Sequence, residues 1–368
     1  MKYQISENLK KVIPIILATF FGLLVGALVI IISEENPIIV YSELFEKSFI
    51  RIYYLLQTLT RSTPIIICAI ATAAAWRAGY INIGVEGQMI VGGFFATVVA
   101  LYMPGPAFIV MICSVLAGMA GGAAYAMIAA VLNLKFKVSI VISTLMMNYI
   151  ASNITSYFAN FPLKDPGGDG LAAQTSMIRE GLRFTKLSST GTFNIGFFLM
   201  ILIIGIFLFI TRKTVFGYES KMTGFNPNFS KYGGVDESKT MLKTMALSGA
   251  IAALAGIIEI FGLKYRFIDG MFTSTSYAWT GLMAGLIAGL NPIGIFFTGI
   301  FLSGLQVGGQ SIQRSTNVPL EMSTVIQSCI TLFVSAKFFV NLLKSKVNNR
   351  DIDEDFTDIT EIGGEDGI

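Results

Sequence analysis

Two long apolar runs of the chain are joined by Trp76-Arg77-Ala78-Gly79-Tyr80-Ile81-Asn82-Ile83-Gly84-Val85-Glu86-Gly87-Gln88. This stretch holds an arginine, a glutamate, two carboxamides and three glycines. Ionisable groups at membrane depth are costly unless they face protein or water, so by default they mark a functional site. Glycines and a chain break at that depth are tolerated where the backbone packs inside the protein or lines a cavity. The stretch therefore predicts a broken helix beside a permeation pathway.

The composition of the chain is typical of a membrane protein. Hydrophobic residues make up 54% of the chain and charged residues 13%, about half the charged share of a soluble domain. Several apolar windows are long enough to cross a bilayer. We therefore predict an all-α polytopic membrane protein with about ten transmembrane helices. The predicted spans are 12–32, 62–78, 83–103, 107–131, 139–161, 193–210, 244–263, 278–290, 293–309 and 321–343.

A second break is predicted between the spans 278–290 and 293–309. They flank Asn291-Pro292-Ile293-Gly294. Proline disfavours helix at the residue before it, and glycine relaxes the turn. We therefore expect broken helices near 77–88 and 290–294.

Charge predicts the orientation and the end of the membrane domain. Ten spans put both termini on one side; with that side cytoplasmic, the inner segments carry 14 Lys or Arg in 58 residues and the outer segments 10 in 85. This bias favours cytoplasmic termini. Residues 351–368 hold eight acidic residues and no base, which predicts a disordered, solvated cytoplasmic tail, with a docking role as the alternative. The transmembrane domain is thus expected over residues 1–350.

Several classes of enzyme are excluded by what the sequence lacks. It contains no histidine, which removes Ser-His-Asp and Cys-His catalysis and the commonest zinc ligand. Its three cysteines have unrelated spacings and suggest neither a disulfide framework nor a metal site. The G-x-x-x-x-G-K-[ST] phosphate loop is also missing. We expect a transport subunit without catalytic residues, metal, cofactor or nucleic-acid partner. An ion-coupled secondary transporter stays an alternative.

The largest predicted cytoplasmic segment, 211–243, contains a candidate docking element. Asn226-Pro227 favours a turn, and Asn228 is a candidate cap for a short helix that carries Phe229, Lys231 and Tyr232. Gly233-Gly234 would end this helix. The segment is either a knob for a soluble partner or a basic loop that fixes topology.

Several motifs resemble the ABC importer permeases of the nucleoside and simple-sugar branch. The stretch 82–88 is similar to the N-I-G-x-E-G-Q signature of that branch, and Gly217 to Gly234 is similar to its coupling segment. The resemblance runs from about residue 60 to residue 340. Further matches are Ile142 to Ile150, Ser248-Gly249-Ala250 to Ala255-Gly256, Asn291 to Gly294, Val307-Gly308-Gly309 with Gln313-Arg314, and the external loop from Pro162 to Thr175.

The resemblance implies an assembly in the cell membrane. The Glu-Gly-Gln ending and the long N-terminus resemble the larger of two paired permeases. This implies a heterodimer with a second related permease, surrounded by membrane lipid. It also implies ABC ATP-binding subunits that use ATP and Mg²⁺, and an extracytoplasmic substrate-binding lipoprotein that delivers nucleoside. A ribose- or galactose-type sugar permease is the alternative within the family.

The chain departs from the family pattern at three places. Ser139-Ile140 stands where the family has Asn-Glu, which removes a pore charge expected there. Phe229-Ser230 replaces a small pair in the coupling segment, and Gly234 replaces an alanine. The change at 229–230 could match an adapted groove in a partner ATPase.

Two sets of candidate functional residues follow. The translocation pathway set is Trp76, Tyr80, Asn82, Glu86, Gln88, Asn148, Trp279 and Asn291. The ATPase-coupling set is Gly224, Asn226, Pro227, Phe229, Lys231, Tyr232 and Gly233.

Each pathway candidate has a structural alternative. Glu86 could bind a sugar hydroxyl, but an ion pair with Arg77 is favoured because it removes two unpaired charges. Asn82 and Gln88 suit ribose or base edges, and equally the capping of half-helices. Asn148 is more often interhelical glue than a pore contact. The aromatic residues could stack a nucleobase, although interfacial anchoring is the commoner role.

Overall fold

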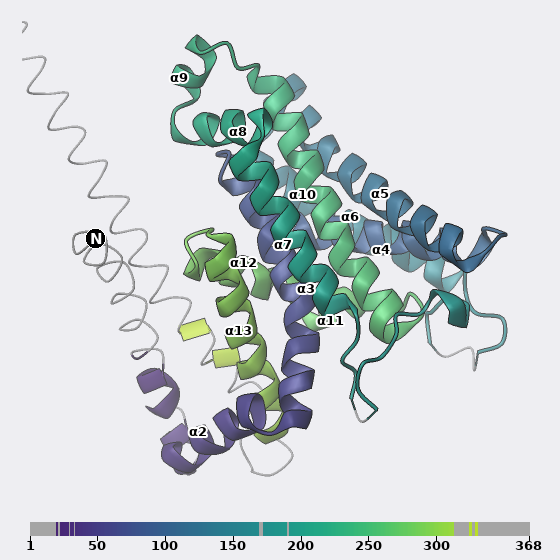
Figure 1. Ribbon diagram of the computed structural model, residues 1–368, viewed down its shortest axis with the longest axis vertical. Coiled ribbons are helices and arrows are strands. Elements are labelled where there is room, and N and C mark those ends of the chain that lie inside the picture. Colours follow the sequence, from purple (N-terminus) through teal and green to yellow (C-terminus); the bar gives the residue numbers. More distant parts are fainter. Residues whose placement is uncertain are drawn as a thin grey trace, which may run out of the picture. The chain divides into compact units, whose positions relative to one another are not determined.

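The computed structural model describes residues 34–168, 172–189 and 191–312, together with positions 20, 23–28, 30–32, 324–325 and 328–329. The chain divides into two compact units, Met1–Val40 with Asn317–Ile368 and Tyr41–Thr316. In the first unit, positions 23–28 and 30–32 are helical, and α2 begins there at Pro37. The second unit holds the other helices (Figure 1).

The named elements of the described residues are all helical. In chain order they are α2 (Pro37–Phe45), the π-helix η1 (Glu46–Ile50), α3 (Ile52–Trp76), α4 (Val85–Tyr102), α5 (Ala107–Phe136), α6 (Ile140–Asn160), the 3₁₀-helix η2 (Glu180–Leu182), α7 (Gly196–Lys213), α8 (Val215–Phe225), α9 (Pro227–Tyr232), α10 (Glu237–Glu259), the π-helix η3 (Ile260–Lys264), α11 (Met271–Thr275), α12 (Tyr277–Ile287) and α13 (Pro292–Ile312).

The predicted all-α polytopic class is confirmed, but fewer than ten long apolar helices lie within the described residues. Within the described residues, six helices are long and apolar enough to cross a membrane: α3, α4, α5, α7, α10 continued by η3, and α13. Two predicted spans differ for physical reasons: α6 is long but more polar, and α12 has only 11 residues. The predicted span 12–32 lies mostly outside the described residues, as do span 321–343 and the acidic tail 351–368.

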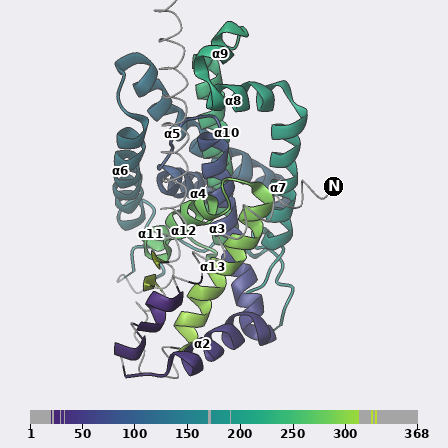
Figure 2. The same ribbon diagram turned by 90° about the vertical axis from the view of Figure 1, so that its left-hand side faces the viewer.

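Helix α3 lies at the centre of the second unit. In its most apolar window 89% of the residues are buried, compared with 22% in α5 and in α7. Helices α10, α12 and α13 pack against it, and α10 also packs against α4 and α5 (Figure 2). The exposed faces of α5 and α7 are therefore left for lipid or another subunit.

Glycines allow close approach of the backbones of α4, α5 and α10. A Cβ atom added at Gly92 of α4 would collide with Ala253 of α10. One added at Gly249 of α10 would collide with the carbonyl oxygen of Gly122 in α5. Inside a membrane the hydrophobic effect does not drive helices together. Small residues at such crossings instead allow the close van der Waals packing that holds the helices in contact.

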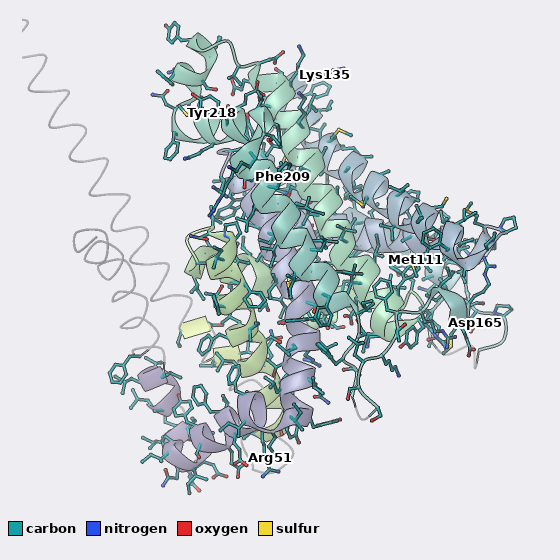
Figure 3. The ribbon with its side chains drawn as sticks, viewed as in Figure 1. Arg51, Met111, Lys135, Asp165, Phe209 and Tyr218 are labelled. Carbon is teal, nitrogen blue, oxygen red and sulfur yellow. The ribbon has the colours of Figure 1, made fainter. Side chains whose placement is uncertain are left out.

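The second unit has two distinct ends. Figure 3 shows Lys135 and Tyr218 at the upper end, Arg51 at the lower end and Asp165 at the right-hand side. The first end carries α8 and α9 (Figure 1). Most of the candidate functional residues lie in the two breaks and in the segment that forms α8 and α9.

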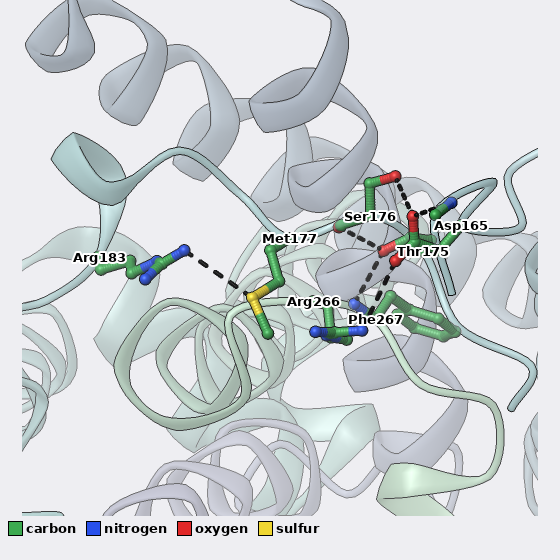
Figure 4. A network of polar contacts seen from close by, with 8 residues as sticks. Asp165, Thr175, Ser176, Met177, Arg183, Arg266 and Phe267 are labelled. Atoms are coloured by element: carbon green, nitrogen blue, oxygen red, sulfur yellow. Dashed lines mark hydrogen bonds and ion pairs between the residues drawn. The ribbon is translucent and has the colours of Figure 1, made fainter. Parts of the chain in front are cut away.

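The loop that follows α6 is tied to the segment after η3 (Figure 4). The backbone N–H of Thr175 donates to the carbonyl of Phe267 at 2.9 Å, and the N–H of Phe267 donates to the Thr175 hydroxyl at 3.1 Å. Asp165 accepts a hydrogen bond from Ser176 at 3.0 Å and lies 3.7 Å from Arg266. The predicted external loop is thus fastened by main-chain and side-chain contacts.

Candidate translocation and coupling site

The first break separates α3, which ends at Trp76, from α4, which begins at Val85. The predicted broken helix near 77–88 is therefore confirmed. Gly79 has a φ of +86°, a conformation that residues with a Cβ rarely adopt. The indole N–H of Trp76 donates to the carbonyl of Asn82 at 3.0 Å, which closes the loop on itself. The hydroxyl of Tyr80 reaches the carbonyl of Glu237 at 3.5 Å, and burial raises the pKa of Tyr80 to about 12.

Asn82 and Gln88 bind each other across the break. Each side-chain amide N–H donates to the other's carbonyl oxygen at 3.1 Å, and both side chains are buried. The Asn82 amide also donates to the hydroxyl of Ser248 in α10 at 3.0 Å. Its oxygen accepts from the N–H of Gly84 at 2.9 Å. The two carboxamides therefore hold the break directly before α4 by binding the protein itself, although the N-cap residue of α4 is Gly84.

Asn148 holds the first break from α6. Its side-chain oxygen accepts from the N–H of Gly87 at 2.8 Å, and its amide donates to the carbonyl of Ile83 at 3.1 Å. The hydroxyl of Thr144, one turn earlier, accepts from the N–H of Ile83 at 3.2 Å. The first N–H groups of a helix lack partners within it, so these contacts from α6 satisfy them at the start of α4. Asn148 is thus interhelical glue.

Glu86 is bound by Trp279 rather than by Arg77. The indole N–H of Trp279 donates to a carboxylate oxygen of Glu86 at 2.8 Å. The expected Arg77–Glu86 ion pair is wrong, because no ion pair joins the two residues, both of which the structure describes. Burial, and to a lesser degree the charge of Arg212, lowers the pKa of Arg77. The Glu86–Trp279 bond links the start of α4 to α12.

A small pocket lies where Glu86 meets Trp279. Its wall includes Thr72, Asn82, Glu86, Trp279 and Leu282, and it has room for about one water molecule. Three of the predicted pathway residues, Asn82, Glu86 and Trp279, therefore meet at one place.

The second break separates α12, which ends at Ile287, from α13, which begins at Pro292. The predicted break near 290–294 is confirmed. Gly289 and Leu290 have φ values of +58° and +60°. Asn291 accepts from the N–H of Ile293 at 3.0 Å and so caps α13. Asn291 makes no hydrogen bond to the first break in the part of the chain that the structure describes.

The coupling segment forms two helices, α8 and α9, and the predicted short helix is confirmed. Asn226, rather than Asn228, is the cap: its oxygen accepts from the N–H of Phe229 at 3.0 Å, with Pro227 in the first helical position. Gly233 ends the helix. The hydroxyls of Thr223 and Ser230 lie 3.0 Å apart and join α8 to α9.

The outer surface of this pair of helices is aromatic. Exposed fractions are 75% for Phe225, 60% for Phe229 and 93% for Tyr232. Large side chains so exposed on a helix pair are typical of a surface that meets another protein.

Sequence reasoning missed a direct contact between α8 and the first break. A Cβ atom added at Gly224 would collide with the carbonyl oxygen of Arg77, and one added at Gly79 would lie 3.5 Å from the Cα of Gly224. The only signal in the sequence was the pair of glycines, Gly79 and Gly224. The first break is therefore in direct backbone contact with α8, the helix that also carries the exposed Phe225.

Comparisons with known proteins agree with this geometry. The chain matches the family described as "Branched-chain amino acid transport system / permease component" over residues 54–335. It is 30% identical to the guanosine ABC transporter permease protein NupP of Bacillus subtilis (strain 168), over 94% of this chain and 99% of NupP. It is 30% identical to the nucleoside ABC transporter permease protein NupB of Lactococcus lactis subsp. cremoris (strain MG1363), over 93% and 95%. The glucose ABC transporter permease protein TsgB13 of Haloferax volcanii is 26% identical, over 88% and 87%.

These matches cover both breaks and the α8–α9 segment. The relatives are permease subunits, which move solutes and leave ATP hydrolysis, with its Mg²⁺, to a separate ATPase. Substrate-binding partners are also part of such systems. The chain therefore belongs to the branched-chain amino acid transport system / permease component family, as a multi-pass membrane permease subunit of an ABC transporter.

Proposed function

We propose that this chain translocates nucleosides as the permease subunit of an ATP-driven importer. The observation that carries the proposal is its similarity, over nearly the whole chain, to two permeases named for guanosine and nucleoside. A simple sugar is the second candidate substrate, because the glucose permease TsgB13 is also similar over most of the chain.

A second related permease completes the pathway in this proposal. The pocket beside Glu86 and Trp279 has room for about one water molecule, so a nucleoside needs more space than this pocket offers. The Glu-Gly-Gln ending at 86–88 resembles the larger member of a permease pair. Two ATP-binding subunits and an extracytoplasmic lipoprotein that delivers the nucleoside complete the assembly, and both termini face the cytoplasm.

Coupling to ATP runs through α8 and α9 in this proposal. The exposed Phe225, Phe229 and Tyr232 dock into the ATPase on the cytoplasmic side. A displacement of α8 is then transmitted to the first break through the contact between Gly224 and Arg77. The Glu86–Trp279 hydrogen bond passes it on to α12 and the second break. In this proposal, the candidate residues around the breaks do not bind the solute. They hold the ends of the helices that move during transport.

Uptake measurements test the substrate. Cells that lack other nucleoside carriers are compared with and without this chain, using labelled purine nucleoside and an excess of unlabelled ribose or glucose. We expect uptake to require the chain and neither sugar to compete. Unchanged nucleoside uptake on deletion, with chain-dependent uptake of a labelled sugar, would contradict the nucleoside proposal and favour the sugar permease. Uptake that follows a proton or sodium gradient and ignores ATP would favour a secondary transporter.

A further inference from the structure

Helix α6 carries a row of exposed polar side chains, which α5 and α7 lack. The exposed residues of α5 between 107 and 131, and those of α7 between 196 and 211, are all apolar. On α6, by contrast, Tyr149, Asn153 and Tyr157 are exposed beside a row of exposed apolar residues that includes Ile150 and Ile154. Their spacing of four residues places them in one row along the helix. We call this row the polar strip.

The hydrogen-bonding capacity of the polar strip is only partly used within the chain. The amide of Asn153 donates to the carbonyl of Tyr149 at 2.7 Å. The phenol hydroxyls of Tyr149 and Tyr157, whose residues are 62% and 59% exposed, have no hydrogen-bond partner among the described residues. Such groups are costly against lipid tails, and polar residues at membrane depth face protein or a water-filled cavity.

A carboxylate and an aromatic pair lie at one end of the strip. The hydroxyl of Ser156 donates to a carboxylate oxygen of Asp269 at 2.9 Å, and Asp269 forms no ion pair within the described residues. The rings of Tyr157 and Phe161 lie with centroids 5.2 Å apart and planes inclined by 40°. A carboxylate accepts hydrogen bonds from hydroxyls, and aromatic rings stack on flat bases.

The other end of the strip adjoins the first break. Asn148, next to Tyr149, binds the backbone at Ile83 and Gly87. A solute that moves along the strip would therefore pass from Asp269 to the half-helix that α6 holds in place. The strip therefore leads from Asp269 to the break that α8 contacts.

We propose that the polar strip, with Asp269 at its outer end, is the wall of the translocation pathway that this chain contributes. The solute it fits is neutral, with several hydroxyls and a flat ring, which is the chemistry of a nucleoside. The nature of the solute rests on the proposed function; the location of the aqueous wall rests on exposure and polarity alone.

Thiol labelling in the assembled transporter tests the wall. Single cysteines replace Tyr149, Asn153 or Tyr157 in a background that carries Cys68→Ala, Cys113→Ala and Cys329→Ala. Ile201→Cys and Leu202→Cys, on the apolar face of α7, are the matched controls. We expect a membrane-impermeant thiol reagent to modify the strip at least about tenfold faster than the controls, because thiolates form in water and not in hydrocarbon.

The outcomes separate the wall from the solute. Labelling no faster than at the α7 controls would overturn the wall. Rapid labelling that guanosine slows supports both the wall and a nucleoside solute. Rapid labelling that ribose slows and guanosine does not would keep the wall and overturn the nucleoside.

Asp269→Asn supplies an independent measurement. We expect this change to raise the KM of nucleoside uptake about tenfold with an unchanged amount of transporter in the membrane, since a charged hydrogen bond to the solute is lost. An unchanged KM would overturn the role of Asp269 at the outer end.

Discussion

The carbonyl oxygen of Arg77 lies against the Cα of Gly224, so closely that no side chain fits between the first break and α8. Such a backbone contact transmits a push without the slack of a flexible side chain. It joins α8, which carries part of the exposed aromatic surface, to the first break, and α4 with Glu86 begins on the other side of that break. Two predictions about coupling follow from this arrangement.

Gly224→Ala is expected to reduce transport per ATP hydrolysed. The added methyl must displace the Arg77 backbone, and overpacking of this kind costs about 1–3 kcal/mol. Uptake and ATP hydrolysis are measured together in vesicles that contain the whole transporter. Gly205→Ala on the exposed face of α7 is the control, since its added Cβ meets nothing within 4 Å. Equal transport per ATP in the two variants would contradict the coupling role of the contact.

Phe229→Asp with Tyr232→Asp is expected to abolish coupled uptake while the protein still folds. Both side chains are exposed, so their loss removes little packing within the chain, whereas a buried charge at an interface is strongly unfavourable. Co-purification of the ATPase with the permease measures docking directly. Retention of both the ATPase and normal uptake would eliminate the aromatic surface as the docking site.

Trp279→Phe is expected to destabilise the link between α4 and α12. It leaves the buried carboxylate of Glu86 without its donor, which costs about 1.5–3 kcal/mol for a hydrogen bond to a charged group. Thermal unfolding of the purified transporter measures the loss, and a double-mutant cycle with Glu86→Gln isolates the pair. If the losses in unfolding free energy of the two single changes were additive, the Glu86–Trp279 bond would contribute no interaction energy, and the prediction would be wrong.

Asn82→Ala and Gln88→Ala are expected to be strongly non-additive. Each carboxamide supplies both a donor and an acceptor to the other, so the first change already breaks both mutual bonds. Each single change should cost about 1–3 kcal/mol by leaving a buried amide unpaired, and the double variant little more. A double variant that loses the full sum in the same unfolding measurement would contradict the reciprocal pair.

Local sequence signals were enough to predict the breaks and the coupling helix. Pro292 and the glycines at 79, 84 and 87 determine where helices can end, and the Asn226-Pro227 pair starts α9. The partner of Glu86 could not be predicted, because Trp279 lies 193 positions along the chain. Arg77 was the nearest opposite charge in the sequence, but Glu86 accepts from Trp279 instead. Likewise, no short motif brings Gly224 next to Arg77.

Within the described residues, α6 differs from the predicted apolar span for a related reason. Span 139–161 was counted for its length, and the polarity of α6 has a meaning only once its neighbours are known. Thr144 and Asn148 are polar because they serve the break, whereas the polar strip is exposed. The sequence of α6 alone cannot distinguish polar residues that bind the break from polar residues that are exposed.

The glycine contacts of α4, α5 and α10 limit which parts of the chain can move. Where Gly249 meets Gly122 and Gly92 meets Ala253, the backbones interlock and cannot slide without a collision. These three helices are therefore expected to shift as one rigid block during a transport cycle. Bending is therefore expected at the two breaks, residues 77–84 and 288–291, which lie between the named helices.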